Sequence, residues 1–293
     1  MDSETPPVSF PDREVALAVQ AAPVEWERVE SGGYSVASAH WRVLLADGRR
    51  AFVKHALTSS AEEALRKERL VYESLQGSFM PAYFGAWDDE TTLLVLEDLS
   101  RAEWPPPWSA ARVDAVLASL DSLHRSRPPR GLDSLETMRE SVVGWRSVAA
   151  DPEVLLGTGL CSRAWLEESL PTLVSAGETA PLGGDDLLHF DVRSDNLCFV
   201  GGQARLVDWN LACIGNRRFD VAFWLPSLAL EGGPDPSALL PDAGALAAAV
   251  AGFFAARAGL PPPATAPTVR EFQRAQAAVA LPWAARELGL TPP

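Results

Sequence analysis

The sequence predicts an α+β fold, in which a small antiparallel sheet with one main helix precedes a larger, mostly helical region. Two turn signals in the first 100 residues, Asp47-Gly48 and Asp88-Asp89-Glu90, each lie between short apolar runs and predict hairpins. A single amphipathic helix pattern separates them. From Ala110 onwards helical patterns dominate. We therefore expect two domains, residues 1–98 and residues 99–293.

The first hairpin pairs strands at residues 41–46 and 50–56, and Lys54 lies inside its second strand. A lysine in a strand usually marks an edge or faces solvent. A carboxylate partner elsewhere in the chain would favour a buried position instead.

The helix between the hairpins supplies such a partner. It is expected to begin at Ser60, with Glu63 completing a capping box, and to stop at Gly77. Glu68 lies within its apolar stripe, which consists of Ala61, Leu65, Tyr72 and Leu75. A buried charge needs a hydrogen-bonded partner of opposite sign. Lys54 is the residue that we expect to pair with Glu68.

Two further features belong to the N-terminal region. The second hairpin, at residues 82–87 and 92–97, runs directly into Asp98-Leu99-Ser100. Between the strands expected at residues 25–30 and 36–46, the segment Ser31-Gly32-Gly33-Tyr34-Ser35 is a candidate phosphate-covering loop. Glycine lets backbone N–H groups approach phosphates closely, although a third glycine is missing here.

The C-terminal region is helical by pattern. Helices are expected at residues 110–126, 135–148, 162–169, 242–258 and 268–288, with a kink at Pro282 in the last of them.

The most informative segment begins at His189 and reads His-Phe-Asp-Val-Arg-Ser-Asp-Asn before an apolar run. Asp191, Asn196 and, after a hairpin at Gly201-Gly202, Asp208 have a spacing that suits phosphoryl transfer. That reaction needs a carboxylate near the attacking hydroxyl and oxygen ligands for Mg²⁺. Asp and Asn are also the commonest turn residues, which is the alternative interpretation.

This segment resembles the catalytic and metal loops of the aminoglycoside phosphotransferase family, whose members are small-molecule kinases with the protein-kinase fold. The resemblance implies a bilobal protein-kinase-like fold. It also implies that Lys54, held by Glu68, anchors the phosphates of ATP or GTP, while Asn196 and Asp208 hold Mg²⁺ and Asp191 orients the acceptor hydroxyl.

The resemblance assigns further contacts to the nucleotide. Gly32, Gly33 and Ser35 match the phosphate loop, and the base would bond backbone groups between Glu97 and Leu99. Backbone contacts do not distinguish ATP from GTP.

The catalytic loop departs from the family pattern at Phe190, where the family usually has glycine. Arg193 matches the position of a phosphate-contacting lysine in protein kinases, and a catalytic role and a surface role both stay open for it. His189 and Asp195 are interpreted as structural. Asp220 is expected to cap the helix that follows the metal loop.

Composition excludes several classes of protein. The net charge of −14 and the pI near 4.7, without a basic stripe, argue against nucleic-acid binding. The apolar run at residues 245–256 is too short for a membrane span, and the acidic N-terminus lacks a basic leader region. Cys161, Cys198 and Cys213 show neither a disulfide framework nor zinc spacing. We expect a cytoplasmic enzyme, and oligomeric state stays open.

The acceptor is expected to be a small molecule with a free hydroxyl. Residues 221–293 carry five acids and four arginines, so the excess acid lies elsewhere, and Trp104-Pro-Pro-Pro-Trp108 offers aromatic faces to a sugar or a flat ring. We favour a nucleoside or other glycosylated antibiotic, and a role in resistance. Aminoglycosides stay open.

Three other functions are possible on sequence grounds. One is a metabolic kinase of the choline, sugar or amino-alcohol type, and another is a catalytically inactive kinase-fold binding protein. A protein kinase is disfavoured, because the eleven residues between Asp208 and Asp220 are too few for a peptide platform.

Overall fold

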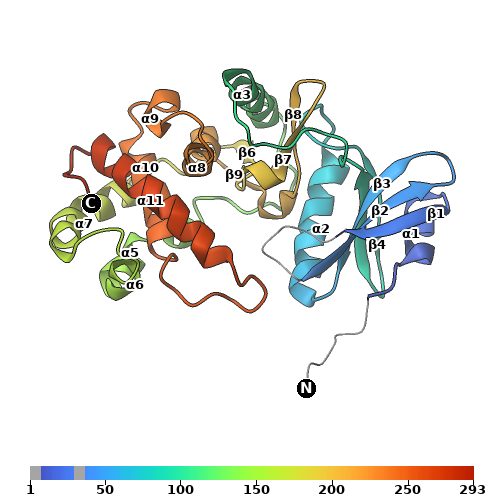
Figure 1. The fold of residues 1–293 in the computed structure, drawn as a ribbon, viewed down its shortest axis with the longest axis horizontal. Coiled ribbons are helices and arrows are strands. Elements are labelled where there is room, and N and C mark those ends of the chain that lie inside the picture. The colour runs from blue at the N-terminus through green and yellow to red at the C-terminus, as the bar shows by residue number, and fades with distance from the viewer. Residues whose placement is uncertain (1–7, 30–36) are drawn as a thin grey trace.

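The structure is a computed structural model that describes residues 8–29 and 37–293, and it confirms the predicted α+β class. Its N-terminal region holds a five-stranded antiparallel sheet, at the right of Figure 1. The strand order is β1-β2-β3-β5-β4. The strands are β1 (Pro23–Val29), β2 (Ser38–Leu45), β3 (Arg50–Ala56), β4 (Tyr83–Asp88) and β5 (Thr92–Glu97). Both predicted hairpins are present, as β2–β3 and β4–β5.

One face of the sheet is covered by α1 (Asp12–Val19), a short helix that the sequence analysis did not predict. Val15 and Val19 of α1 pack against Trp41, Val53 and Val95 of the sheet. Alternate strand residues point to opposite faces. The residues between these therefore face the other side, and Lys54 is one of them.

The other face is covered by α2 (Ser59–Ser74), the main helix of the region. Ala61 and Leu65 of α2 pack against Leu94 of β5, and Tyr72 is also buried, whereas Leu75 lies just beyond the helix and is half-buried. The predicted capping box is wrong, because the N-cap is Thr58, whose side chain accepts the Ala61 N–H. Thr58 has the extended backbone that a cap requires, whereas Ser60 already lies in the first turn.

The C-terminal region is mostly helical, with two small antiparallel sheets that carry the segment from His189 to Asp208. Strand β6 (Asp186–Leu188) pairs with β9 (Cys213–Gly215), and β7 (Leu197–Val200) pairs with β8 (Gln203–Leu206). The helices are α3 (Ala110–His124), α4 (Arg139–Val143), α5 (Trp145–Ala150), α6 (Glu153–Leu156), α7 (Arg163–Glu178), α8 (Arg217–Leu230), α9 (Pro236–Leu239), α10 (Gly244–Ala255) and α11 (Val269–Glu287).

Two predicted helices differ from those observed. The helix expected at residues 135–148 is divided into α4 and α5 by Gly144, which has a φ of +71°. The helix expected at residues 162–169 continues to Glu178, with Pro171 inside it. Among the described residues, no helix is both long and apolar enough to cross a membrane.

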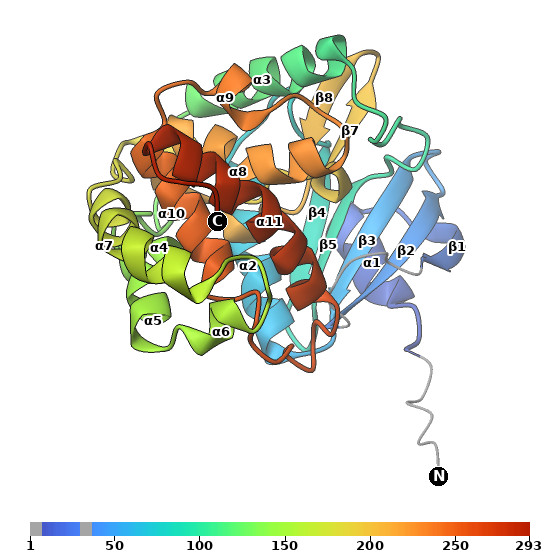
Figure 2. The same cartoon turned by 60° about the vertical axis from the view of Figure 1, so that its left-hand side comes forward.

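Helix α10 lies at the centre of the helical region, beside α11 and next to α4 and α7 (Figure 2). Nearly all of its residues are buried, as expected for a helix that is apolar on every side. Gly252 lets it approach the α4–α5 junction closely. A Cβ at this position would lie 1.9 Å from the carbonyl oxygen of Val143 and 2.6 Å from the indole nitrogen of Trp145.

Gly252→Ala is therefore expected to destabilise the protein, although alanine favours helices by about 1 kcal/mol over glycine. We expect the free energy of unfolding to fall by about 3 kcal/mol, because the overlap is with backbone that cannot move locally. Urea denaturation would measure this change.

Gly159→Ala is the matched control. Gly159 has a φ of +71°, but a Cβ added there would meet no atom within 4 Å, so only the backbone cost of about 1 kcal/mol applies. Equal stability of the two variants would contradict the close-packing argument.

Candidate active site

A cleft of about 870 Å³ lies between the sheet and the helical region. Its N-terminal side is formed by β2, β3 and α2, and its C-terminal side by the segment that follows β6 and by the start of η2 (Trp209–Leu211). The described sequence-predicted site residues that line it are Lys54, Glu68, Glu97, Leu99, Arg193, Asn196 and Asp208. Gly32, Gly33 and Ser35 lie outside the described residues.

The deepest part of the cleft holds a cluster of three charges. The Lys54 ammonium donates to both carboxylate oxygens of Glu68, at 2.9 and 2.8 Å, and to Oδ1 of Asp208 at 2.9 Å. The Glu68 side chain is fully buried and that of Lys54 is 13% exposed. Burial alone would lower the pKa of Lys54, but the carboxylates of Asp208 and Glu68 outweigh it and raise the pKa. The lysine is therefore a permanent cation.

Asp191 and Asn196 are brought together by the loop after β6. The Asn196 amide donates to the Asp191 carboxylate at 2.8 Å and to the Asp191 carbonyl at 2.9 Å. Asn196 ends a short 3-10 turn, η1 (Ser194–Asn196). Arg193 approaches the same carboxylate, with Nε 3.3 Å from Oδ1 of Asp191, and its Nη2 lies 3.0 Å from Asp195.

Burial changes the titration of the candidate base. It raises the pKa of Asp191 to about 6, with Asp208 adding to the shift and Arg193 opposing it. A carboxylate with this pKa is ionised at neutral pH. It is also more basic than an ordinary aspartate, which suits a group that orients a hydroxyl and takes its proton.

Asp220 holds the backbone of the loop that carries Asp191. It was expected to cap α8, but Asn216 is the N-cap, and Asp220 is buried inside the helix. Its carboxylate accepts the backbone N–H groups of His189 and Phe190, at 2.9 and 2.7 Å, and also bonds to His124 at 3.0 Å. Asp220 thus fixes the backbone immediately before Asp191.

Two residues of this site have a left-handed backbone conformation. Phe190 has a φ of +65° and Asp208 a φ of +68°, a conformation that costs residues other than glycine about 1–2 kcal/mol. The Phe190 ring packs against Phe219 and Phe223 of α8. Aromatic packing and the bonds to Asp220 therefore hold a bulky residue where the family usually has glycine.

The segment after β5 forms the end of the cleft. Glu97 and Leu99 both line it, but the Glu97 side chain is engaged elsewhere, because it accepts from Ala82 N at 3.0 Å and from Arg205 at 2.5 Å. The Trp104 indole donates to the Leu99 carbonyl at 3.3 Å, and 39% of the residue stays exposed. Trp104 thus presents part of an aromatic ring at this end of the cleft.

Sequence reasoning missed the wall of the cleft that β2 and β3 form with His40, Arg42 and Phe52. His40 stacks on Phe52 with ring centroids 5.4 Å apart. Burial, together with Lys54, lowers the pKa of His40 to about 4, so its ring is neutral. The sequence contained a signal for this wall. His40 and Arg42 alternate with the apolar residues Trp41 and Val43, which are buried, so the two polar side chains belong to the opposite face of the strand.

The chemistry of the donor set fits a magnesium ion. Oδ1 of Asp208 is bonded to Lys54, which leaves Oδ2 for a ligand, and Asn196 bonds Asp191 through its nitrogen, which leaves its oxygen. Among the described residues no group of three or more His, Cys, Asp or Glu side chains could hold a metal. Mg²⁺ is commonly bound by one or two protein oxygens together with substrate phosphates, so this pair is sufficient.

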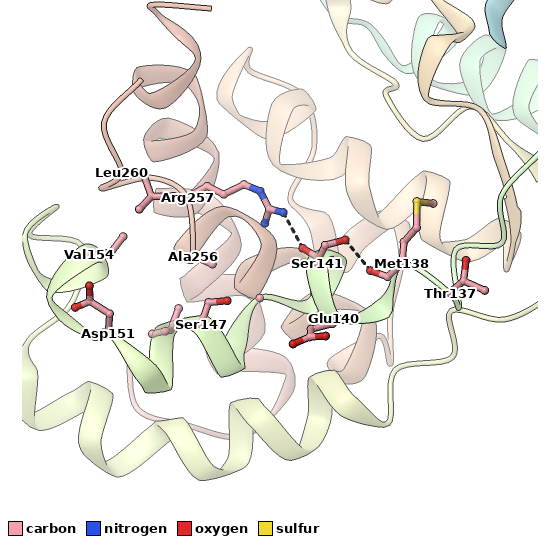
Figure 3. A pocket seen from close by; sticks show the side chains of 12 residues that line it. Thr137, Met138, Glu140, Ser141, Ser147, Asp151, Val154, Ala256, Arg257 and Leu260 are labelled. Atoms are coloured by element: carbon pink, nitrogen blue, oxygen red, sulfur yellow. Dashed lines mark hydrogen bonds between the residues drawn. The ribbon is translucent and has the colours of Figure 1, made fainter. Parts of the chain in front are cut away.

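A second hollow, of about 620 Å³, lies at the α4–α5 junction and the end of α10 (Figure 3). Arg257 lines it, and its guanidinium already donates to the carbonyls of Ser141, at 2.8 Å, and Phe253, at 3.0 Å. The hollow shares no lining residue with the cleft in the described part of the chain. It contains none of the predicted site residues.

The fold and the cleft define a protein-kinase-like small-molecule kinase. Residues 29–240 match the model of the phosphotransferase enzyme family. The chain therefore belongs to this family, which confirms the resemblance and makes it a phosphotransferase with a hydroxyl acceptor. A search among curated proteins finds no match.

Solved structures with similar folds include three kinases. The chain resembles an amicoumacin kinase in complex with AMP-PNP, Ca²⁺ and Ami (13% identity, TM-score 0.57, covering 91% of each chain). A choline kinase from Cryptosporidium parvum has 12% identity and a TM-score of 0.57, with 92% of this chain and 91% of that one covered. A macrolide 2'-phosphotransferase from Brachybacterium faecium has 14% identity and a TM-score of 0.51, with 94% and 88% covered. At these identities the likeness shows the fold.

Asp191→Asn is expected to stabilise the ligand-free protein. Because folding raises the pKa of Asp191, its ionised form destabilises the fold; this cost is complete above about pH 6 and disappears as the pH falls towards the ordinary value of 3.8. The variant should therefore melt about 3 °C higher than the wild type at pH 8, and this advantage should shrink at pH 5. Differential scanning calorimetry at the two pH values would measure it.

Asp195→Asn is the control, because the Asp195 side chain is 43% exposed and its charge carries little burial cost. A lower melting temperature for Asp191→Asn at pH 8 would contradict the assignment of a carboxylate whose ionised form destabilises the fold.

Proposed function

We propose that the protein transfers the γ-phosphate of ATP or GTP, in a Mg²⁺-dependent reaction, to a hydroxyl of an antibiotic or a similar metabolite, and that it confers resistance. The observation that carries this proposal is the meeting of Lys54, Asn196 and Asp208 in one cleft, although they come from distant parts of the chain, with Asp191 bonded to Asn196 beside it. Each has the chemistry that phosphoryl transfer requires.

The chain's own residues divide the work. Lys54, fixed by Glu68, binds phosphate oxygens, and Asp191 orients the acceptor hydroxyl and takes its proton as the new O–P bond forms. The bond from the γ-phosphorus to the bridging oxygen breaks, and the nucleoside diphosphate leaves. Arg193, whose Nε lies 3.3 Å from Oδ1 of Asp191, contacts the transferred phosphate. Asn196 and Asp208 would hold Mg²⁺, which neutralises phosphate charge when bound.

The acceptor side favours a hydroxylated molecule with little positive charge. Residues 221–293 carry five acids against four arginines, so this part of the chain adds little excess negative charge that would attract a polycation. The exposed part of the Trp104 ring suits a sugar or a flat ring. A nucleoside or other glycosylated antibiotic fits these features.

The test is incubation of the purified protein with Mg²⁺, ATP or GTP, and a panel of acceptors, followed by mass spectrometry. The panel contains nucleoside antibiotics, macrolides, aminoglycosides, choline-like amino alcohols and sugars. We expect a mass gain of one phosphate on a nucleoside or other glycosylated antibiotic of little positive charge. Modification of an amino alcohol alone would replace the antibiotic assignment with a metabolic one.

Two substitutions separate the roles of the acids. Asp191→Asn should lower turnover about a thousandfold and leave the affinity for Mg²⁺-nucleotide nearly unchanged, because the carboxylate acts on the hydroxyl. Asp208→Ala should weaken nucleotide binding in Mg²⁺ and have a smaller effect in EDTA. Calorimetric titration with AMP-PNP and steady-state kinetics would measure both.

The assignment fails if Asp191→Asn turns over at the wild-type rate. It fails equally if Asp208→Ala binds Mg²⁺-nucleotide as tightly as the wild type.

A further inference from the structure

A carboxylate outside the cleft joins the catalytic turn to the segment that follows β5. Glu231 directly follows α8, and both of its carboxylate oxygens accept hydrogen bonds. Oε2 accepts the indole N–H of Trp108 at 2.7 Å, and Oε1 accepts the hydroxyl of Ser194. The three residues are far apart in the sequence, so this junction exists only in the folded protein.

Ser194 connects the junction to the catalytic groups. It is the first residue of the turn η1, and it lines the cleft. The last residue of the same turn, Asn196, donates to the carboxylate of Asp191. A displacement of Ser194 would therefore move the amide that holds Asp191 in place.

Trp108 connects the junction to the wall of the cleft. Its ring packs against Trp224 of α8, with centroids 5.6 Å apart, and against Phe199 of β7 at 6.3 Å. The segment that ends at Trp108 includes Trp104 and Pro105, which line the cleft. Trp108 is thus the anchor of this wall on the helical region.

We propose that Glu231 is a positioning residue for phosphoryl transfer, which holds the turn η1 against the Trp108 anchor and so sets the position of Asp191 and Asn196. This inference rests on the proposed function. A carboxylate at the C-terminal end of a helix is disfavoured by the helix dipole. Its benefit must therefore come from the hydrogen bonds that it accepts.

Glu287 provides a matched control. It is the last residue of α11, it is also half-buried, and its carboxylate accepts the Ser237 hydroxyl at 2.5 Å and the Ala243 N–H at 3.2 Å. In the described part of the chain, neither Glu287 nor these partners line the cleft. The two glutamates make similar bonds, but only Glu231 is connected to the catalytic turn.

The experiment compares Glu231→Gln with Glu287→Gln. Only one of the two terminal atoms of a glutamine is an oxygen, so when it accepts from Trp108 its amide nitrogen faces Ser194, and the charge-assisted bond from the Ser194 hydroxyl is lost. We expect Glu231→Gln to lower kcat about tenfold or more, since small displacements of reacting groups are costly, with the KM for Mg²⁺-ATP within about twofold. Glu287→Gln should leave kcat unchanged, although both variants lose a few degrees of melting temperature.

Two further variants test the connection itself. Trp108→Phe keeps a ring but removes the N–H, and Ser194→Ala removes the hydroxyl. If Glu231 acts through Ser194, the double variant Glu231→Gln/Ser194→Ala should lose no more turnover than Glu231→Gln alone. Multiplied losses would overturn the proposed connection, and so would a wild-type kcat in Glu231→Gln.

A measurement without turnover separates this inference from the proposed function. Hydrogen–deuterium exchange of the amides at residues 191–197 should be faster in Glu231→Gln than in the wild type, and unchanged in Glu287→Gln. Unchanged exchange in Glu231→Gln overturns the positioning role. A wild-type protein that phosphorylates no acceptor and does not hydrolyse ATP would count against the proposed function instead.

Discussion

The pairing of Lys54 with two carboxylates is the constraint on which the rest of the site depends. Glu68 is fully buried, and an unpaired charge there would be strongly unfavourable. The sheet must therefore bring β3 over α2, and the β7–β8 hairpin must deliver Asp208 to the same ammonium. Because Lys54 lies in one region and Asp208 in the other, the same three charges also join the two sides of the cleft.

The catalytic loop is shaped mainly by residues that are not expected to touch substrate. Asp220 holds the backbone before Asp191, and the His189 ring bonds to the Val207 carbonyl at 2.9 Å, one residue before Asp208. The candidate base and the candidate metal ligand are thus fixed to a common scaffold. Such supporting contacts allow the strained backbone of Phe190 and Asp208 to persist.

Sequence patterns predicted the structure correctly where it depends on residues that are close together in the chain. The Asp47-Gly48 turn, the stripe of α2 with Glu68 inside it and the spacing of Asp191, Asn196 and Asp208 each depend on near neighbours. The role of Asp220 was not visible, because its partners are about thirty residues away in the sequence and are backbone N–H groups. The division at Gly144 was missed for a similar reason. At this point the chain lies against Gly252 of α10, which is more than a hundred residues away in the sequence. The boundary at residues 98/99 and the individual roles of the site residues stay predictions.

The burial of Trp209 determines which compounds can compete for the cleft. Its indole is fully buried between His189, at a centroid distance of 4.6 Å, and Phe79, at 6.2 Å. The chain then enters β9, which is paired along its length with β6. An inhibitor that required the aromatic residue beside Asp208, the candidate metal ligand, to leave its site would have to displace Trp209 from this packed position. Inhibitors should therefore be sought among molecules that occupy the candidate nucleotide cleft itself and contact His40 and Phe52 in its wall.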